Sequence, residues 1–299
     1  PFDANGDAFS ELTSIENSTV GARFFHRFGY RSKVSIDFFN IKEDRRGGNK
    51  FELPEHEADI AESVNHNIST GGITYEQFFR EYDLLSVYAS GQFVDRDSYY
   101  GALQSLTDYG HTKGTTYILG TQYKAVFKNS SLVVGGEYLG DQLLDNKLGY
   151  PDYSDPIFLN DSIVGFNNVG NTLIANQQTG TLGLFSQYDF SLGAFLFSVG
   201  GRYDNYKITD LKKDETDTGS AFSPRISISA NILPKLQGRL SYSKGYRAPQ
   251  IYDEDLHIET SGSRKVIHQN SANLTQESSH SLMASLDLNG ELGSASYSF

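Results

Sequence analysis

The sequence predicts an all-β fold, an antiparallel transmembrane β-barrel of the outer-membrane type. Three observations support this prediction. Apolar and polar residues alternate with a period of two, short tight turns alternate with long polar loops, and the strand-like segments are about twice the usual ~5–6 residues. A transmembrane barrel explains all three, because each strand needs one face for lipid and one for the lumen.

The alternation is clearest in the segment from Phe222 to Ile232. One face carries apolar residues such as Ile226 and Ile228, and the other carries polar residues such as Arg225 and Ser227. Side chains of a strand point to opposite faces in turn, whereas a helix would repeat its apolar positions with a period near 3.6. Each such segment is therefore expected to be a strand with an apolar and a polar face.

Twelve strands are expected, in six hairpins that follow one another along the chain. Their ranges and tight turns are 19–28 and 33–45 around Gly29–Ser32, 70–80 and 84–95 around Glu81–Asp83, 114–127 and 131–144 around Lys128–Ser130, 178–190 and 194–207 around Ser191–Gly193, 221–232 and 236–247 around Leu233–Lys235, and 277–289 and 293–299 around Asn289–Leu292. Asn289-Gly290 is a strong hairpin signal, and Pro234 falls where no strand needs an N–H.

Long polar loops are expected between these hairpins, at Arg46–Ser69, Asp97–Lys113, Asp145–Gln177, Leu211–Ser220 and Ala248–Gln276. Such loops lie at the extracellular rim of an outer-membrane barrel, where ligands arrive. A soluble β-sandwich has shorter strands, and a propeller would show a fixed repeat of ~40 residues that this sequence lacks.

Composition fits this class. The 299 residues are 38% hydrophobic with a mean hydropathy of -0.43, and no apolar run reaches the ~18 residues of a transmembrane helix. Aromatics make up 13%, without Trp, and suit the two membrane interfaces. The net charge of -12 disfavours nucleic acid as a partner, and the absence of Cys excludes disulfides and thiolate metal sites.

Both ends of the sequence are expected to be cut. The polar start Pro1–Asn17 contains no signal peptide, and the segment 293–299 is shorter than the ~9–11 residues of a spanning strand. The alternative is that Phe299 is a true aromatic terminus and that twelve strands close alone, since single-chain barrels start at eight strands.

Four motifs resemble those of TonB-dependent outer-membrane receptors, in the order of that family. Gly245-Tyr246-Arg247-Ala248-Pro249-Gln250 resembles the YRAP box, and Asn270–Leu274 followed by Glu277 resembles the NPNL box. The paired motifs at Leu184–Tyr188 and Gly200–Asp204 are similar to the family's FxQY and GxRYD strands. Arg45–Gly48, with Pro54 and Glu57, looks like a loop common in members that resemble the colicin I receptor, and the YRAP-like and NPNL-like boxes are associated with haem receptors without being confined to them.

The resemblance implies a fold and a set of partners. It implies that residues 1–299 are a partial slice, about 12 strands, of a barrel that typically has 22 strands and a plugged lumen. The plug domain is not present in this sequence and is expected outside it. The implied partners are this plug, the TonB energy-coupling protein, outer-membrane lipid of a Gram-negative bacterium and a surface lipoprotein. The second box has Ser-Ala where the family usually has Pro, which leaves that loop's rigidity open.

Candidate site residues cluster in and after the YRAP-like box. Candidate ligand-binding residues for a haem iron or a chelate are Arg247, Tyr252, His257 and His268, since imidazole suits iron. The family-motif positions are Tyr246, Arg247, Ala248, Pro249, Asn273 and Leu274. The alternative is that the two histidines are solvated loop residues.

Acidic loop residues are candidate Ca²⁺ ligands. They are Asp253 and Asp255, with Asp95 and Asp97 as a second group. The alternative is a solvated charge run at the rim. No covalent cofactor is expected.

Arginines lie on the polar faces of the expected strands. They are Arg23, Arg27, Arg202, Arg225, Arg239 and Arg247. They could bind carboxylates of a plug or of an anionic chelate, or pair internally with Asp37, Asp204 and Asp287.

The favoured function is TonB-dependent uptake of a scarce metal chelate, ferric siderophore or haem, with cobalamin as the alternative cargo. A passive pore or structural barrel is the alternative of another class. A barrel enzyme ranks last, because the sequence has neither an HExxH nor a GxSxG motif.

Overall fold

A computed structural model of the chain describes residues 2–4, 6, 9–249, 275–290 and 293–298. Over these residues the chain is built from antiparallel strands and one short 3₁₀ turn. The strands of the main sheet are β1 (Ser10–Phe28), β2 (Ser32–Gly48), β3 (Ile60–Phe78), β4 (Leu84–Ala102), β5 (Tyr109–Val126), β6 (Ser130–Lys147), β9 (Thr172–Leu192), β10 (Phe195–Asp210), β11 (Glu215–Leu233), β12 (Leu236–Arg247), β13 (Glu277–Gly290) and β14 (Gly293–Ser298).

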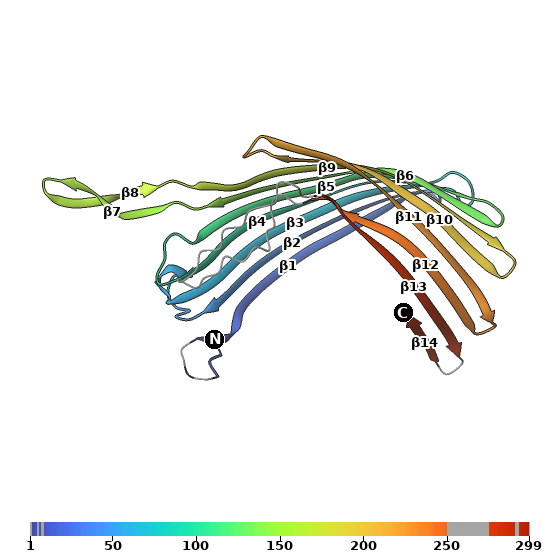
Figure 1. Ribbon diagram of the computed structural model, residues 1–299, viewed down its shortest axis with the longest axis horizontal. Helices are drawn as coiled ribbons and strands as arrows, with labels where there is room; N and C mark the ends of the chain where they lie inside the picture. Colours follow the sequence, from blue (N-terminus) through green and yellow to red (C-terminus); the bar gives the residue numbers. More distant parts are fainter. Residues whose placement is uncertain (1, 5, 7–8, 250–274, 291–292, 299) are drawn as a thin grey trace.

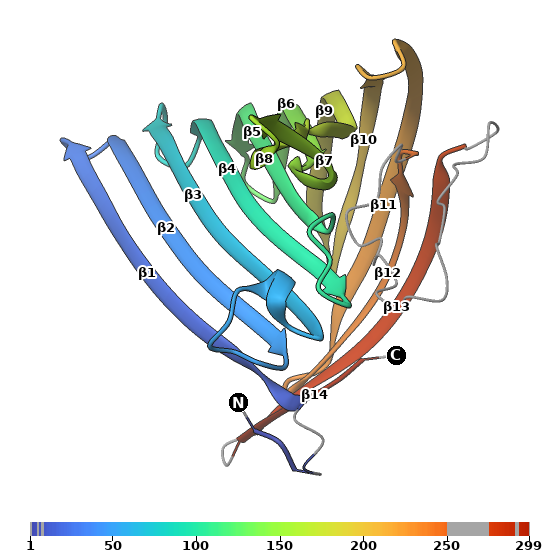
Figure 2. The ribbon, with the colours of Figure 1, turned by 90° about the vertical axis from the view of Figure 1, so that its left-hand side faces the viewer.

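The twelve expected strands are confirmed and form one antiparallel sheet, in the order β1-β2-β3-β4-β5-β6-β9-β10-β11-β12-β13-β14. The described residues contain two further strands, between β6 and β9, that were not expected. The sheet is strongly curved and open, with β1 and β14 at its two edges (Figures 1 and 2). No helix in the part that the structure describes is long and apolar enough to cross a membrane.

The register gives the sheet one apolar and one polar face. Residues directly opposite each other on paired strands share a face. Val199 of β10 lies opposite Ile226 of β11, and Tyr203 lies opposite Phe222. All four side chains are about half exposed, as expected of a surface that contacts lipid. The next residues along the strands belong to the other face, which carries the polar side chains.

The short connections 29–31, 79–83, 127–129, 193–194 and 234–235 lie at one end of the main sheet. The turn before β4 is fixed by Asp83, whose carboxylate accepts hydrogen bonds from the backbone N–H of Val126 and the hydroxyl of Tyr123, both at 2.9 Å. Arg80 pairs with the same carboxylate at 2.9 Å. The hydrogen bond from Val126, with those of its other partners, lowers the pKa of Asp83. The turn is thereby attached to the neighbouring hairpin.

The loops at the opposite rim are shorter than predicted, because the strands continue into them. Only residues 49–59, 103–108 and 211–214 connect strands where Arg46–Ser69, Asp97–Lys113 and Leu211–Ser220 were expected. The first of these loops contains the 3₁₀ turn η1 (Glu55–Glu57). Beyond the membrane both faces of a strand are wetted, so the outer parts of the strands lack the alternation on which the prediction depended.

The expected loop Asp145–Gln177 is also largely strand. It contains a separate hairpin, β7 (Tyr150–Leu159) and β8 (Ser162–Val169), which extends beyond the main sheet (Figure 1). Its turn residues Asn160 and Asp161 have φ of 48° and 61°. Positive φ at both central positions is the requirement of a type I′ turn, which Asn and Asp tolerate.

Candidate functional site

A row of residues crosses the polar face from β4 to β10. Tyr88 lies opposite Gly120, Gly120 opposite Glu137, Glu137 opposite Gly183, and Gly183 opposite Asp204. Large polar side chains thus alternate with glycine from one strand to the next. A Cβ on Gly120 would meet the ring of Tyr88, and one on Gly183 would meet Asp204 and its neighbour Arg202. The two glycines therefore let side chains reach over a whole strand.

Two hydrogen bonds use this space to join strands that are not neighbours. The hydroxyl of Tyr88 donates to Oε2 of Glu137 at 2.9 Å, across β5. Nη1 of Arg202 donates to Oε1 of the same carboxylate at 2.5 Å, across β9. Side chains two strands apart approach each other on the concave side of a curved sheet. The polar face is therefore the inner face of the trough.

Arg202 also binds Asp204, its neighbour on the same face of β10. Nε lies 2.7 Å from Oδ1 and 2.9 Å from Oδ2 of Asp204, whose side chain is almost fully buried. Internal pairing of a wet-face arginine with Asp204 is confirmed. For Arg23, Arg27, Arg225 and Arg239 the register confirms only that they share this face, with Arg23 opposite Asp37 and Arg225 opposite Gly200.

The row continues toward the extracellular rim through two stacked tyrosines. Tyr246 of β12 interacts with Asp204, and its ring stacks on Tyr206 of β10 at 6.1 Å between centroids and 18° between planes. The hydroxyl of Tyr206 donates to Oε1 of Gln276 at 3.2 Å, just before β13. We call these six residues the lumenal network: Tyr88, Glu137, Arg202, Asp204, Tyr206 and Tyr246.

The lumenal network contains two carboxylates and one guanidinium, so it has one net negative charge. Its charged groups are largely satisfied within the sheet, which a water-poor lumen requires. It can fix the spacing of β4, β6, β10 and β12 and present hydroxyl and carboxylate groups to whatever fills the trough. The sequence indicated Arg202, Asp204 and Tyr246 as candidate residues but not Tyr88, Glu137 or Tyr206, because the register decides which residues meet.

The YRAP-like box lies at the end of β12. Tyr246 and Arg247 are the last two residues of β12, and Arg247 lies opposite Glu277 of β13. Ala248 and Pro249 follow outside the strand. The structure thus brings Tyr246 into the lumenal network. The other predicted site residues lie outside the described residues: Tyr252, Asp253, Asp255, His257, His268, Asn273 and Leu274.

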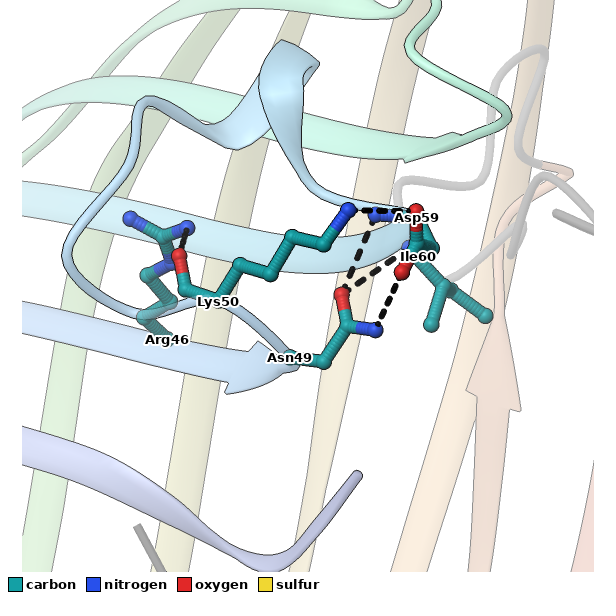
Figure 3. Close-up of polar contacts among 5 residues, drawn as sticks. All are labelled: Arg46, Asn49, Lys50, Asp59 and Ile60. Carbon is teal, nitrogen blue, oxygen red and sulfur yellow. Dashed lines mark hydrogen bonds and ion pairs between the residues drawn. The ribbon is translucent and has the colours of Figure 1, made fainter. Parts of the chain in front are cut away.

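The loop between β2 and β3 is ordered by polar contacts that sequence reasoning missed (Figure 3). Nζ of Lys50 pairs with Asp59 at 2.7 Å, and the amide of Asn49 binds both the side chain and the backbone N–H of Asp59. Arg46 donates to the carbonyl oxygens of Leu53 and Lys50 at 2.7 and 3.2 Å. Residues 49–59 are therefore held as a closed loop.

A small aromatic cluster attaches this loop to β4 and β5. Tyr99 and Tyr109 lie 4.6 Å apart, and Tyr109 hydrogen-bonds Nδ1 of His56 at 2.9 Å. The hydroxyl of Tyr99 donates to the carbonyl of Ser105 at 2.9 Å. Burial, with the nearby Asp108 carboxylate, raises the pKa of Tyr99 to about 12. The two rim loops 49–59 and 103–108 are thereby joined to each other.

The described residues include no group of three or more His, Cys, Asp or Glu suited to a metal ion. Among the predicted Ca²⁺ candidates, Asp97 accepts a hydrogen bond from Nδ1 of His111 at 2.6 Å, and Asp95 lies 3.5 Å from Nε2 of the same ring. In the structure both carboxylates therefore face the ring of His111.

Solved structures of receptors and transporters resemble this fold. The ferripyoverdine receptor of the Pseudomonas aeruginosa outer membrane matches with a TM-score of 0.69 at 14% identity, over 96% of this chain and 41% of that one. The FrpB iron transporter from Neisseria meningitidis matches with 0.66 at 15%, over 95% and 44%. The siderophore receptor PiuA from Acinetobacter baumannii matches with 0.66 at 9%, over 97% and 50%.

At such identities these likenesses show the fold alone, and the chain spans half or less of each of these proteins. No curated protein matches the sequence. The family comparison is more specific. Residues 4–299 match the family described as TonB dependent receptor-like, beta-barrel, a family of receptors and transporters rather than enzymes. The chain therefore belongs to the β-barrel domain of TonB-dependent receptors, which are outer-membrane β-barrels of Gram-negative bacteria.

Proposed function

We propose that this chain is the barrel of a receptor that takes up a scarce metal chelate, a ferric siderophore or haem, through the outer membrane. The observation that carries the proposal is the family match over residues 4–299. Structures described as an iron transporter and as a siderophore receptor share the fold, which supports this choice of cargo. Cobalamin, taken up by the same mechanism, is the alternative.

The lumenal face would bind the receptor's own plug domain, which lies outside this sequence. Glu137 and Asp204 retain lone pairs beyond their bonds to Arg202, and the Tyr88 and Tyr246 hydroxyls border the same face. These groups can accept or donate hydrogen bonds to a polar plug surface. The TonB protein of the inner membrane would then pull on the plug and open the lumen. Outer-membrane lipid would contact the apolar face.

The cargo would bind at the rim above this network. Arg247, Tyr252, His257 and His268 remain the candidate ligand residues, and Asp253 and Asp255 the candidate Ca²⁺ ligands that would order the same loop. A surface lipoprotein is a further candidate partner. Nucleic acid is not a candidate partner, because the net charge is -12.

Growth of a strain lacking the gene, on single sources of iron or corrinoid, tests the proposal. The account expects loss of growth on one ferric siderophore or on haem, and the same loss when TonB is removed. Loss on a corrinoid alone would favour cobalamin. Uptake that persists without TonB would favour a passive pore, and unchanged growth on every chelate would contradict the transport function.

The candidate histidines can be tested separately from transport. If haem is the cargo, His257→Ala and His268→Ala should lower haem affinity and change the Soret spectrum of the receptor. His280→Ala is a matched control, because this histidine already hydrogen-bonds the Tyr242 hydroxyl at 2.9 Å. Equal haem spectra for all three variants would exclude the two loop histidines as iron ligands.

A further inference from the structure

The β7–β8 hairpin exposes an unusual amount of apolar surface. It extends away from the main sheet in Figure 1 and is separate from it in the sheet topology. Seven of its large apolar side chains are exposed, by 37% to 62%: Tyr153, Ile157, Phe158, Leu159, Ile163, Val164 and Val169. These side chains lie on both faces of the hairpin, because consecutive residues such as Phe158 and Leu159 point to opposite faces. Exposed apolar side chains on an extracellular element indicate an interaction surface.

The hairpin has its own internal contacts, which hold this surface in a defined shape. Tyr153 of β7 and Phe166 of β8 meet edge-to-face at 4.9 Å. Nδ2 of Asn167 donates to Asp155 at 2.9 Å across the hairpin. Together with the type I′ turn, these contacts order both strands without help from the main sheet. The apolar surface is therefore preorganised, which lowers the entropic cost of binding.

The two outer edges of the hairpin differ. Pro151 and Pro156 interrupt β7, and its pairing with β8 is irregular between them. A second irregularity leaves Val164 of β8 as an extra residue, because Phe158 pairs with Ile163 and Ile157 pairs with Gly165. Proline on an edge strand removes donors and blocks further pairing. β8, from Ser162 to Val169, contains no proline. In the described residues β8 pairs only with β7, so its other edge is open.

The geometry of the turn shows where this edge begins. Leu159 and Ser162 flank the turn and lie opposite each other. In a hairpin with a two-residue turn, the two residues that flank the turn exchange hydrogen bonds with each other. The next residue of β8 therefore directs its N–H and C=O away from β7. That residue is Ile163, whose side chain belongs to the exposed apolar surface.

The charge of the hairpin narrows the choice of occupant. From Leu148 to Asn171 there is no Lys, Arg or His, whereas Asp152, Asp155 and Asp161 are present. An anionic lipid surface would be repelled, and a second copy would bring two acidic hairpins together. A protein segment with basic residues beside an apolar stretch complements both the aspartates and the apolar side chains of the hairpin.

We propose that the open edge of β8 binds an extended segment of a separate cell-surface or secreted protein by strand addition. Apolar and polar side chains alternate along this segment, and its apolar side chains cover Ile163 and its neighbours. It carries Lys or Arg near the aspartates. Main-chain hydrogen bonds supply affinity and the apolar positions supply specificity, as in other cases of β-strand addition. This role is additional to chelate uptake.

Binding of a synthetic peptide to the full-length receptor in nanodiscs tests the proposal. The peptide alternates valine and threonine and carries lysines at both ends. Ile163→Pro removes one outward N–H and should weaken binding about fivefold or more, while Ile163→Ala keeps the N–H and should weaken it less. Asp161→Asn removes one negative charge but keeps a residue type that tolerates positive φ in the turn. It should weaken binding about two- to threefold at low salt.

Two peptide controls and one receptor control complete the experiment. A peptide with a central proline, and one with glutamates in place of the lysines, should both bind at least about fivefold more weakly. Chelate uptake by the Ile163→Pro receptor should equal that of the unmodified receptor, which separates this proposal from the transport function. Equal binding of all three peptides, or equal affinity of Ile163→Pro and Ile163→Ala, would overturn strand addition.

Discussion

Replacing Arg202 with methionine tests whether the lumenal network holds the barrel together. Methionine keeps most of the length and apolar stem of the side chain but cannot donate a hydrogen bond. The substitution removes the bonds to Glu137 at 2.5 Å and to Asp204 at 2.7 and 2.9 Å. Asp204 would keep its interaction with Tyr246, and Glu137 would keep the hydroxyl of Tyr88.

The expected size of the effect follows from burial. Removing one partner of a buried ion pair costs about 3–5 kcal/mol, since the other charge is left uncompensated. The side chain of Asp204 is 3% exposed, but that of Arg202 is 32% exposed, so water can replace part of the loss. We therefore expect the free energy of unfolding to fall by about 2–3 kcal/mol.

Denaturant unfolding of the full-length receptor in detergent micelles, followed by the β-sheet circular dichroism band, measures this loss. Arg225→Met is the matched control, because Arg225 shares the face and is exposed, and it should change stability by less than about 0.5 kcal/mol. A double-mutant cycle of Arg202→Met with Asp204→Asn should give a coupling energy of about 1–2 kcal/mol. A coupling energy near zero, or equal stability of the two methionine variants, would refute the role given to the network.

Three further predictions concern the faces, the glycine row and the rim. Ala89→Arg, on the apolar face of β4, should destabilise the membrane-inserted barrel by about 2–4 kcal/mol, while Ser90→Arg on the lumenal face should cost clearly less; equal costs would contradict the assignment of faces. Gly183→Ala places a Cβ against Arg202 and Asp204 and should cost about as much as Arg202→Met, whereas Gly91→Ala, with no neighbour nearer than 3.7 Å, should be nearly neutral by the same unfolding assay. Because the raised pKa of Tyr99, about 12, lies above its unfolded value, the stability that it contributes is complete below about pH 10 and is lost as the pH rises toward 12. The difference in 295 nm absorbance between the receptor and its Tyr99→Phe variant should titrate near pH 12, and a midpoint near 10 would refute the burial of this hydroxyl.

The membrane-spanning parts of the strands could be predicted from the sequence because lipid and lumen impose opposite demands on successive residues. Residues 222–232 show this plainly, with Ile226 and Ile228 on one face and Ser227 on the other. Residues 60–69, by contrast, belong to β3 but contain polar residues on both faces, such as Asn65 and His66. Where both faces meet water, the period of two disappears and the strand looks like a loop.

The β7–β8 hairpin was missed for a different reason. Asn160-Asp161 is compatible with a type I′ turn, and this signal could have identified it. Pro151 and Pro156, however, argue against a strand on sequence alone. The irregular pairing around these prolines shows how the structure accommodates them.

Contacts between side chains on different strands were the least accessible to sequence reasoning. The resemblance to the YRAP box indicated Tyr246 and Arg247, but not that Tyr246 would stack on Tyr206. Similarly, the meeting of Tyr88, Glu137 and Arg202 depends on the register of the intervening strands and on Gly120 and Gly183. Alternation assigns a residue to a face, whereas only the register assigns its neighbours.

The most direct test of the account measures which side chains of one strand contact lipid. Single cysteines at Ile226, Ser227, Ile228 and Ser229 of β11, in the full-length receptor, can carry a bimane fluorophore in bilayers that contain brominated lipid. Lipid should strongly quench the fluorophore at Ile226 and Ile228 and quench it weakly at Ser227 and Ser229. Uniform quenching, or stronger quenching at the two serines, would contradict a sheet that turns its apolar face to the membrane and its polar face to the lumen.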